Sequence, residues 1–500
     1  MRNSQLAAAL SIYAALRILI FVAAFPPMNN TDEKSHFFTI YEYAQGHFPA
    51  RELPHLDQEF ANNLLPYWSP EYILDEGELK RIGITKPLYR LSPEEQTASL
   101  RQGFYKEKLD TWVSMLDHED QGPPLYYLTA AAWYRLGKAL GVGFRGAILW
   151  IRLLNPIFYG LSVWLSYKFV SSVYPERTFL CLAVPALLAV FPQDVFFGMN
   201  RDVLSTVMVA GVLVLMVRVI KNKNHGSLVA ASFLVGLCFL VELSNCVLYG
   251  SLVACLYVWA RESEVAVLRK VAIVAASSLA ALLAPCIWIL RNLLVVGDIT
   301  GSRAKAHGFG WTMKPASEFF HHPLFSSHGL SYFLVELTRS FWNGEYVWHG
   351  IPMRSRGADT FYLLSTAILF CVVVVFLIRR WKMLAFPPKF ALGQCLFLVV
   401  SSILFLAAVS LPFDFHGFRG LSGPHPFFAS GRIISGILLP FVFIYARGLE
   451  IVLEPFRRWI SPTMVLALLL LFITASQVWI RRAVFHSPYN FLSLALVRKE

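Results

Sequence analysis

Charged residues are scarce in this chain of 500 residues, where Asp, Glu, Lys and Arg together make up 15%. Soluble domains carry about 25% charged residues, whereas hydrophobic residues here reach 56% and the mean hydropathy is +0.52. This composition argues against a soluble enzyme and indicates a polytopic membrane protein. The net charge of +12 requires no nucleic-acid partner, because the basic residues mostly flank apolar runs.

Cysteine is scarce in the polar loops. All seven cysteines fall inside or at the edge of apolar runs: Cys181, Cys238, Cys246, Cys255, Cys286, Cys371 and Cys395. A disulfide framework needs cysteines in extracellular loops, and a zinc site needs close pairs such as C-x-x-C. The sequence therefore suggests neither of them.

Long apolar runs are abundant. About 20 helical residues cross a hydrocarbon core, and helices satisfy the backbone amides in lipid. Runs of suitable character lie near 6–26, 148–170, 178–193, 203–219, 227–241, 245–260, 271–290, 359–378, 390–411, 430–447 and 462–480. The first run carries Arg17 and lacks a clear cleavage site, so we interpret it as a retained helix rather than a signal peptide.

Basic clusters after every second run predict the orientation, because Lys and Arg gather in cytoplasmic loops. The resulting division is a first transmembrane helix (1–27), an external loop with juxtamembrane or re-entrant helices (28–147), a transmembrane bundle (148–290), a second external loop (291–358), C-terminal transmembrane helices (359–480) and an external tail (481–500). It holds only if residues 124–141 do not span the membrane. That segment is short and carries Arg135 and Lys138, which favours an interfacial or re-entrant helix.

The stretch PPMNNTDEKSHFF (26–38) places Asp32, Glu33 and His36 where the first helix leaves the membrane. Residues 32–46 have the apolar spacing of an amphipathic helix. Acidic residues in the first turn of a helix can serve as caps and can complement its dipole. Ionisable groups at a membrane boundary also mark functional sites. Both interpretations of the two carboxylates stay open on the sequence.

Five stretches together resemble bacterial membrane proteins of the GT-C glycosyltransferase superfamily. They are PPMNNTDEKSHFFTIYEYAQGHFP (26–49), GPPLYYLTAAAWYRLG (122–137), IRLLNPIFYGLSVWLSYKFVSSVYPER (151–177), FPQDVFFGMNRDVLSTVMVAG (191–211) and ASGRIISGILLP (429–440). The closest similarity is to an uncharacterised bacterial branch, and protein O-mannosyltransferases and lipid A aminoarabinose transferases are more distant. The resemblance implies an all-α GT-C-like bundle of about 11 to 13 transmembrane helices with a large helical first external loop.

The resemblance also implies an activity: inverting transfer of a hexosyl or pentosyl group from a polyprenyl-phosphate donor, such as undecaprenyl phosphate. The acceptor would be an envelope glycan, lipid or protein on the outer face of the bacterial inner membrane. An acceptor hydroxyl needs a base to take its proton, and we expect Asp32 to be that base, with Glu33 beside it and His36 binding substrate. The phosphate leaving group needs positive charge rather than a strong acid.

Arg432 matches the Gly-Arg of the family pattern and is a candidate for the donor phosphate, although an interfacial arginine would look the same. Arg291 is a further candidate for binding the donor phosphate, and it too could be an interfacial arginine. Arg17 lies in mid-span, which points to a functional group or a buried ion pair. Asn200 and Asp202 either converge on substrate or cap the helix that follows them. No cofactor is required, but Asp32 and Asp202 are compatible with a divalent ion such as Mg or Mn.

One residue departs from the family. Many relatives carry a lysine in the short external turn after the sixth span, where this chain has Glu242. Either another cation, such as Arg432 or Arg291, binds the donor, or Glu242 pairs with one of these, or the protein handles its donor differently. A secondary transporter, a polymerase or ligase of lipid-linked polysaccharide and a non-catalytic scaffold are the alternatives, although no repeated half of a transporter is visible.

Overall fold

The computed structural model describes residues 2–416, 421 and 424–496. In these residues nine helical segments are long and apolar enough to cross a membrane. They are built from α1 (Arg2–Ala24), α8 (Phe144–Arg152) with α9 (Leu154–Val173), α11 (Asp202–Asn222), α13 (Leu248–Glu262), α14 (Val267–Arg291), α17 (Arg356–Arg380), α18 (Phe386–Ser410), α19 (Leu438–Leu453) and α20 (Pro462–Phe485). Two shorter apolar helices, α10 (Thr178–Val190) and α12 (His225–Phe239), bring the set to the eleven apolar runs of the sequence.

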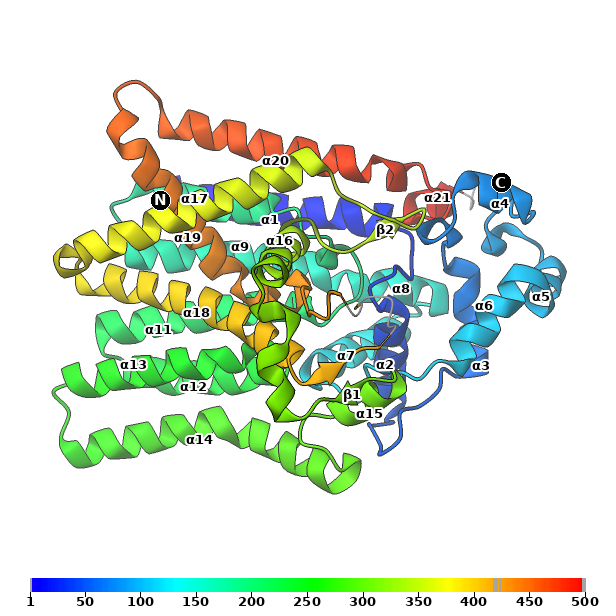
Figure 1. The fold of residues 1–500 in the computed structure, drawn as a ribbon, viewed down its shortest axis with the longest axis horizontal. Coiled ribbons are helices and arrows are strands. Elements are labelled where there is room, and N and C mark those ends of the chain that lie inside the picture. Colours follow the sequence, from blue (N-terminus) through cyan, green and yellow to red (C-terminus); the bar gives the residue numbers. More distant parts are fainter. Residues whose placement is uncertain (1, 417–420, 422–423, 497–500) are drawn as a thin grey trace.

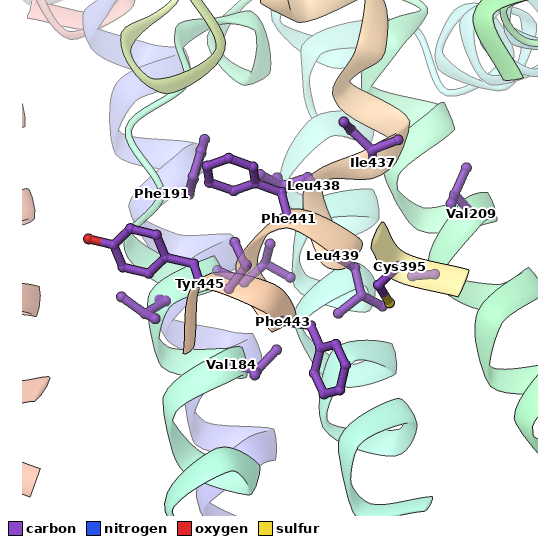
Figure 2. Close-up of a cluster of buried hydrophobic side chains, with 14 of the residues drawn as sticks. Val184, Phe191, Val209, Cys395, Ile437, Leu438, Leu439, Phe441, Phe443 and Tyr445 are labelled. Carbon is purple, nitrogen blue, oxygen red and sulfur yellow. The ribbon is translucent and has the colours of Figure 1, made fainter. Parts of the chain in front are cut away.

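These helices run side by side as one bundle (Figure 1). Helix α19 lies at its centre, where Phe441, Phe443 and Tyr445 pack among side chains of α10, α11 and α18 (Figure 2). Helix α20 lies at the periphery and exposes most of its apolar surface, as a lipid-facing helix should. The prediction of an all-helical polytopic membrane protein is therefore confirmed.

The large loops gather at one end of the bundle (Figure 1). The first contains α2 (Glu33–Gln45), α3 (Gln58–Leu64), α4 (Glu76–Arg81), α5 (Pro93–Arg101), α6 (Gly103–Ser114) and α7 (Leu125–Ala139). The second contains α15 (Ser302–Gly308), α16 (Ser327–Asn343) and the strands β1 (Thr312–Met313), β2 (Val347–Trp348) and β3 (Ile351–Pro352). Strand β4 (Phe413–Asp414) pairs antiparallel with β1 and ties the third loop to the second, and β2 pairs with β3.

Helix α7 decides the topology of the first loop. It has 15 residues, packs against α2 and α8, and is not among the helices of the described segments that are long enough to span. Its position beside α2 agrees with the non-spanning interpretation of residues 124–141. The ionic contacts of Arg201 and Arg432 place the segments around Asp32, Asn200 and Glu242 at the same end of the bundle.

Element ends differ slightly from the sequence-based divisions. Helix α14 continues through a π-turn to Val296, and α20 ends at Phe485 rather than near 480. The predicted tail contains α21 (Phe491–Leu496), and its residues 497–500 lie outside the described part of the chain. All seven cysteines belong to described segments and are free, as the sequence predicted.

Candidate functional site

Asp32 directly precedes α2 but does not cap it. Its backbone is left-handed, with φ 66°, and its side chain accepts no hydrogen bond from the first turn of the helix. The capping interpretation of Asp32 is therefore wrong. The carboxylate instead accepts a hydrogen bond from Arg432 Nη2 at 3.0 Å, and its other oxygen lies 3.3 Å from His118 Nε2. The side chain keeps 29% of its surface exposed, so a substrate can reach it.

Opposing effects act on the pKa of the Asp32 carboxyl. Burial favours the neutral acid and raises the pKa, but the positive charges of His118, Arg432 and Lys305 favour the carboxylate and outweigh burial. The pKa of Asp32 therefore lies well below its ordinary value. Asp32 is ionised at neutral pH and can accept a proton.

Glu33, the next residue, has a different environment. Its side chain is fully buried and receives Nε and Nη2 of Arg152, each at 2.6 Å. It also accepts hydrogen bonds from the backbone N–H of Met199 and from the backbone and side chain of Asn29. Both oxygens are occupied by protein donors, so the structure places Glu33 in a structural ion pair that joins α2 to α8 and the 199 turn.

Arg432 links three segments that are distant in sequence. It lies in a 3₁₀ segment (Gly431–Ile437) before α19 and is close to three carboxylates. Nη2 contacts Asp32, Nη1 lies 3.5 Å from Asp202, and Nε lies 3.4 Å from Glu345. The structure thus brings together Asp32, Asp202 and Arg432, which the sequence analysis had selected separately.

Asn200 supports this arrangement from the turn before α11. Its Oδ1 accepts the backbone N–H of Asp202 at 2.8 Å, which orders the start of the helix. The helix-ordering interpretation therefore applies to Asn200, whereas the Asp202 side chain faces Arg432. The Nδ2 of Asn200 is buried and has no hydrogen-bond partner among the described residues.

Glu345 reaches Arg432 because the FPQD motif holds its loop. The carboxylate of Asp194 accepts the backbone N–H groups of Glu345 at 3.2 Å and Tyr346 at 2.8 Å. A Cβ on Gly344 would overlap Asp194, and φ at this glycine is 89°, so no other residue fits there easily. The sequence analysis quoted FPQD but did not select Asp194 or Glu345.

Glu119 is the second centre of the ionic network, and sequence reasoning missed it. It is buried and pairs with Arg201 Nη1 at 2.9 Å and Lys305 Nζ at 3.0 Å, and it accepts the Tyr127 hydroxyl at 3.1 Å. His118 Nε2 lies 3.6 Å from it. The signal was the cluster DHED at 117–120, immediately before the quoted GPPLYY motif.

Burial and charge also compete at Glu119. Burial raises its pKa, but the charges of Arg201 and Lys305 outweigh this and hold it well below the usual range. The neighbouring Asp120 keeps a raised pKa of about 7, because burial there exceeds the opposing charge of Arg291. The loop therefore combines an anionic Glu119 with an acid that titrates near neutrality.

His36 lies behind this network rather than in an open cleft. Its Nδ1 is 2.8 Å from the Tyr127 hydroxyl and 4.0 Å from Glu119. Burial is the main cause that lowers the pKa of His36 to about 3, so the ring is neutral at physiological pH. With 1% of its side chain exposed, His36 can orient Tyr127 and Glu119 but has no surface for substrate.

Glu242, the residue that departs from the family pattern, pairs with Arg201 at 2.5 Å. Its partner is neither Arg432 nor Arg291, the two cations considered from the sequence. Because Arg201 also holds Glu119, an unbroken chain of contacts runs from Glu242 through Arg201 and Glu119 to His118 and Asp32. Glu242 is thus integrated into the candidate site.

Arg17 lies away from this network. It donates to Gln477 of α20 and to the carbonyl oxygens of Ala189 and Phe191, and it pairs with no carboxylate of the described residues. The ion pair that the sequence suggested for Arg17 is not formed within the described residues. Arg17 instead joins α1, α10 and α20 through hydrogen bonds.

The described residues include two apolar cavities near the ends of α14 and α16. One, of about 190 Å³, is lined by α16, α17, α18 and the Arg432 segment, including Phe341, Ile403 and Ile434. Arg432 does not line this cavity, but it belongs to the same 3₁₀ segment as Ile434, which does. The other, of about 330 Å³, lies between α2, α7 and α14 and is lined at its edge by Arg291.

A divalent ion fits the cluster poorly. Asp32, His118 and Glu119 offer ligand atoms within 4.8 Å of one another. However, Glu119 already contacts Arg201 and Lys305, and Asp32 contacts Arg432. An ion would have to displace these cations, so we derive no chemical step through a metal.

Comparison with known proteins places the chain in one family. Residues 16–418 match the family described as "Predicted membrane protein (DUF2142)". No curated protein matches the chain. Because the match covers well over half of the sequence, the chain belongs to this family of membrane proteins.

Proposed function

We propose that this member of the DUF2142 family is a membrane glycosyltransferase that moves a sugar from a polyprenyl-phosphate donor to an envelope acceptor on the extracytoplasmic face. One observation carries the proposal: a partly exposed, uncapped carboxylate, Asp32, contacts Arg432, whose 3₁₀ segment also contributes Ile434 and Ile437 to the wall of an apolar cavity. A base beside a phosphate-binding group and a hydrocarbon-binding surface is what this reaction requires. The resemblance of five motifs to GT-C enzymes supports the same activity.

The reaction uses Asp32 as general base. The acceptor oxygen attacks C1 of the sugar, the C1–O bond to phosphate breaks, and its electron pair leaves with the phosphate. The acceptor proton passes to the Asp32 carboxylate, and C1 is inverted because attack and departure take place on opposite faces. His118 and Lys305 help to keep Asp32 ionised before the acceptor arrives.

Arg432 binds the donor phosphate. Its three carboxylate neighbours lie at 3.0 to 3.5 Å, and only the contact with Asp32 is a hydrogen bond of ordinary length. A guanidinium binds phosphate bidentately and stabilises the charge that develops on the leaving group. Phosphate therefore replaces Asp32 on Arg432, which frees the carboxylate for the acceptor hydroxyl at the moment the donor is bound.

The isoprenoid chain of the donor occupies the cavity of about 190 Å³ beside Arg432. Its walls are apolar side chains of α16, α17, α18 and α19, and the exposed Ala367 and Val400 open it to the lipid side. A chain that enters from the bilayer can thus place its phosphate at Arg432 without leaving a hydrophobic surface.

Glycan analysis of the cell envelope tests the proposal. A deletion strain is complemented with the wild-type chain, with Asp32→Asn, or with Asp110→Asn, a matched change at an exposed carboxylate of α6. We expect a sugar to disappear in the deletion strain and to return with wild type and Asp110→Asn only. An unchanged envelope in every strain would contradict the proposal, and uptake of a solute in proteoliposomes would then identify a transporter.

A further inference from the structure

We infer that the acceptor is itself a lipid with a phosphate group, and that its hydrocarbon chain lies in the cavity of about 330 Å³ between α2, α7 and α14. This inference rests on the proposed function and adds the class of the second substrate. We call this cavity the α14 groove. It is separate from the cavity that we assign to the donor, which is lined by α16, α17, α18 and α19.

The lining of the α14 groove has the character of a lipid-chain site. Its walls include Phe48, Leu128, Leu240 and Ile287, and nearly all of the lining is apolar. Leu128 and Ile287 remain 45% and 61% exposed, so the groove is open on the side that faces lipid. Hydrocarbon can enter it directly from the bilayer.

A cation stands at the polar edge of the α14 groove. Arg291 donates to the carbonyl oxygen of Pro49 and to Asn292 Oδ1. A guanidinium has five N–H donors, so donors remain for a phosphate. Apolar walls with a single arginine among the lining residues match an amphiphile with a phosphate head.

The α14 groove is joined to the catalytic carboxylate through its inner wall. Tyr43 lines the groove and packs against Tyr127 with ring centroids 5.8 Å apart, and Tyr127 donates to Glu119. Leu240 lines it as well, two residues before Glu242, whose partner Arg201 also holds Glu119. The inner wall of the groove is therefore built from residues that also contact the ionic network around Glu119.

The two cavities are lined by different helices, α2, α7 and α14 for one and α16, α17, α18 and α19 for the other. Figure 1 shows α14 at one edge of the bundle and α17 toward the other, with α11 and α18 between them. Base and leaving group must face opposite sides of the reacting carbon for inversion. Donor and acceptor lipids bound along different helices are able to approach the reacting carbon from different directions.

Photo-crosslinking in nanodiscs tests the assignment. A photoreactive amino acid replaces Ile287 in the α14 groove, or Leu279, which is exposed on the same helix but does not line the groove. The discs contain phosphatidylcholine with a minor share of phosphatidic acid, which supplies acyl chains and a phosphate. We expect capture of phosphatidic acid at 287 to exceed that at 279 about tenfold, the effect of one charged hydrogen bond, and Arg291→Gln to abolish the excess.

Equal capture at the two positions would overturn the inference, and this comparison does not depend on whether Arg291→Gln folds. A parallel experiment with a polyprenyl monophosphate uses a photoreactive residue at Ala367 of the donor cavity. Capture of this probe at 287 instead of 367 would also overturn the inference, because the groove would then hold the donor. Failure at 367 alone would count against the proposed function and leave the 287 result standing.

Crosslinking in cells then identifies the acceptor. The lipid captured at 287 should carry a phosphate and a free hydroxyl, and its glycosylated form should be absent from a strain carrying Asp32→Asn. Accumulation of the missing sugar on protein or on a water-soluble glycan would overturn a lipid acceptor.

Discussion

Asp32 and Glu33 are neighbours in sequence, but the protein treats their carboxylates in opposite ways. Glu33 is fully buried and its two oxygens receive Arg152, Met199 and Asn29. Asp32 is partly exposed, lacks a capping bond and shares Arg432 with two other acids. The difference arises from the left-handed backbone at Asp32, which turns its side chain away from the helix that Glu33 begins. A satisfied carboxylate builds the fold, and an incompletely satisfied one is available for chemistry.

The largest expected effect is on the rate. Asp32→Asn preserves the shape of the side chain and removes the base, so turnover should fall by about 10² to 10⁴-fold. Thermal unfolding in detergent should change little, because Asp32 makes no helix cap. An assay of sugar transfer from a purified polyprenyl-phosphate sugar measures the turnover. A melting curve measures the stability. If Asp32→Asn unfolds as it loses activity, then Asp32 has a structural role like that of Glu33, and the contrast between the two carboxylates is wrong.

Glu33→Gln should have the opposite consequence, a loss of stability of the folded protein. The change leaves the guanidinium of Arg152 buried without its counter-charge, which destabilises a protein by about 3 to 5 kcal/mol. We expect a lower midpoint of unfolding and poor yield of folded protein. Asp32→Asn is the matched control at the adjacent position, and an equally stable Glu33→Gln protein without activity would instead assign Glu33 a catalytic role.

Arg432→Gln tests the proposed binding of the donor phosphate next to Asp32. The variant removes the charged contact to phosphate, so affinity for polyprenyl phosphate should drop about tenfold. Native mass spectrometry or a competition assay can measure this. Arg291→Gln provides the control, because Arg291 borders the other cavity and should leave donor affinity unchanged. Equal losses in both variants would show that the two cavities do not distinguish the substrates.

The last expected effect concerns pH and is spread over several pH units. Burial raises the pKa of Asp120 to about 7, so the native state prefers the protonated acid. The stabilisation is present below about pH 4 and is lost as the pH rises toward 7, at up to about 1.4 kcal/mol per pH unit. Asp120→Asn should weaken this dependence in melting curves recorded across that range. An unchanged slope would show that other groups cause it.

Much of the fold was predictable from the sequence because hydropathy is local. Each apolar run predicted one helix. The eleven runs match nine long and two shorter apolar helices in the described residues. The position of Asp32 at a membrane boundary was also visible. The helix-ordering role of Asn200 was one of the two alternatives that the sequence offered. The role of Glu33 was not visible, because Arg152 and the 199 turn lie far from Glu33 in the chain.

The sequence by itself determined the membrane class, the helices and the chemical types gathered near the external loops. Only the tertiary structure decided which charges meet. Arg432 reaches Asp32 across 400 residues of chain, and Glu119 acquires partners from α15 and the turn before α11. Hydrophobic burial follows from the composition of each segment, whereas an ion pair in a low-dielectric site requires a contact distance of a few ångströms. Helix packing alone sets such distances.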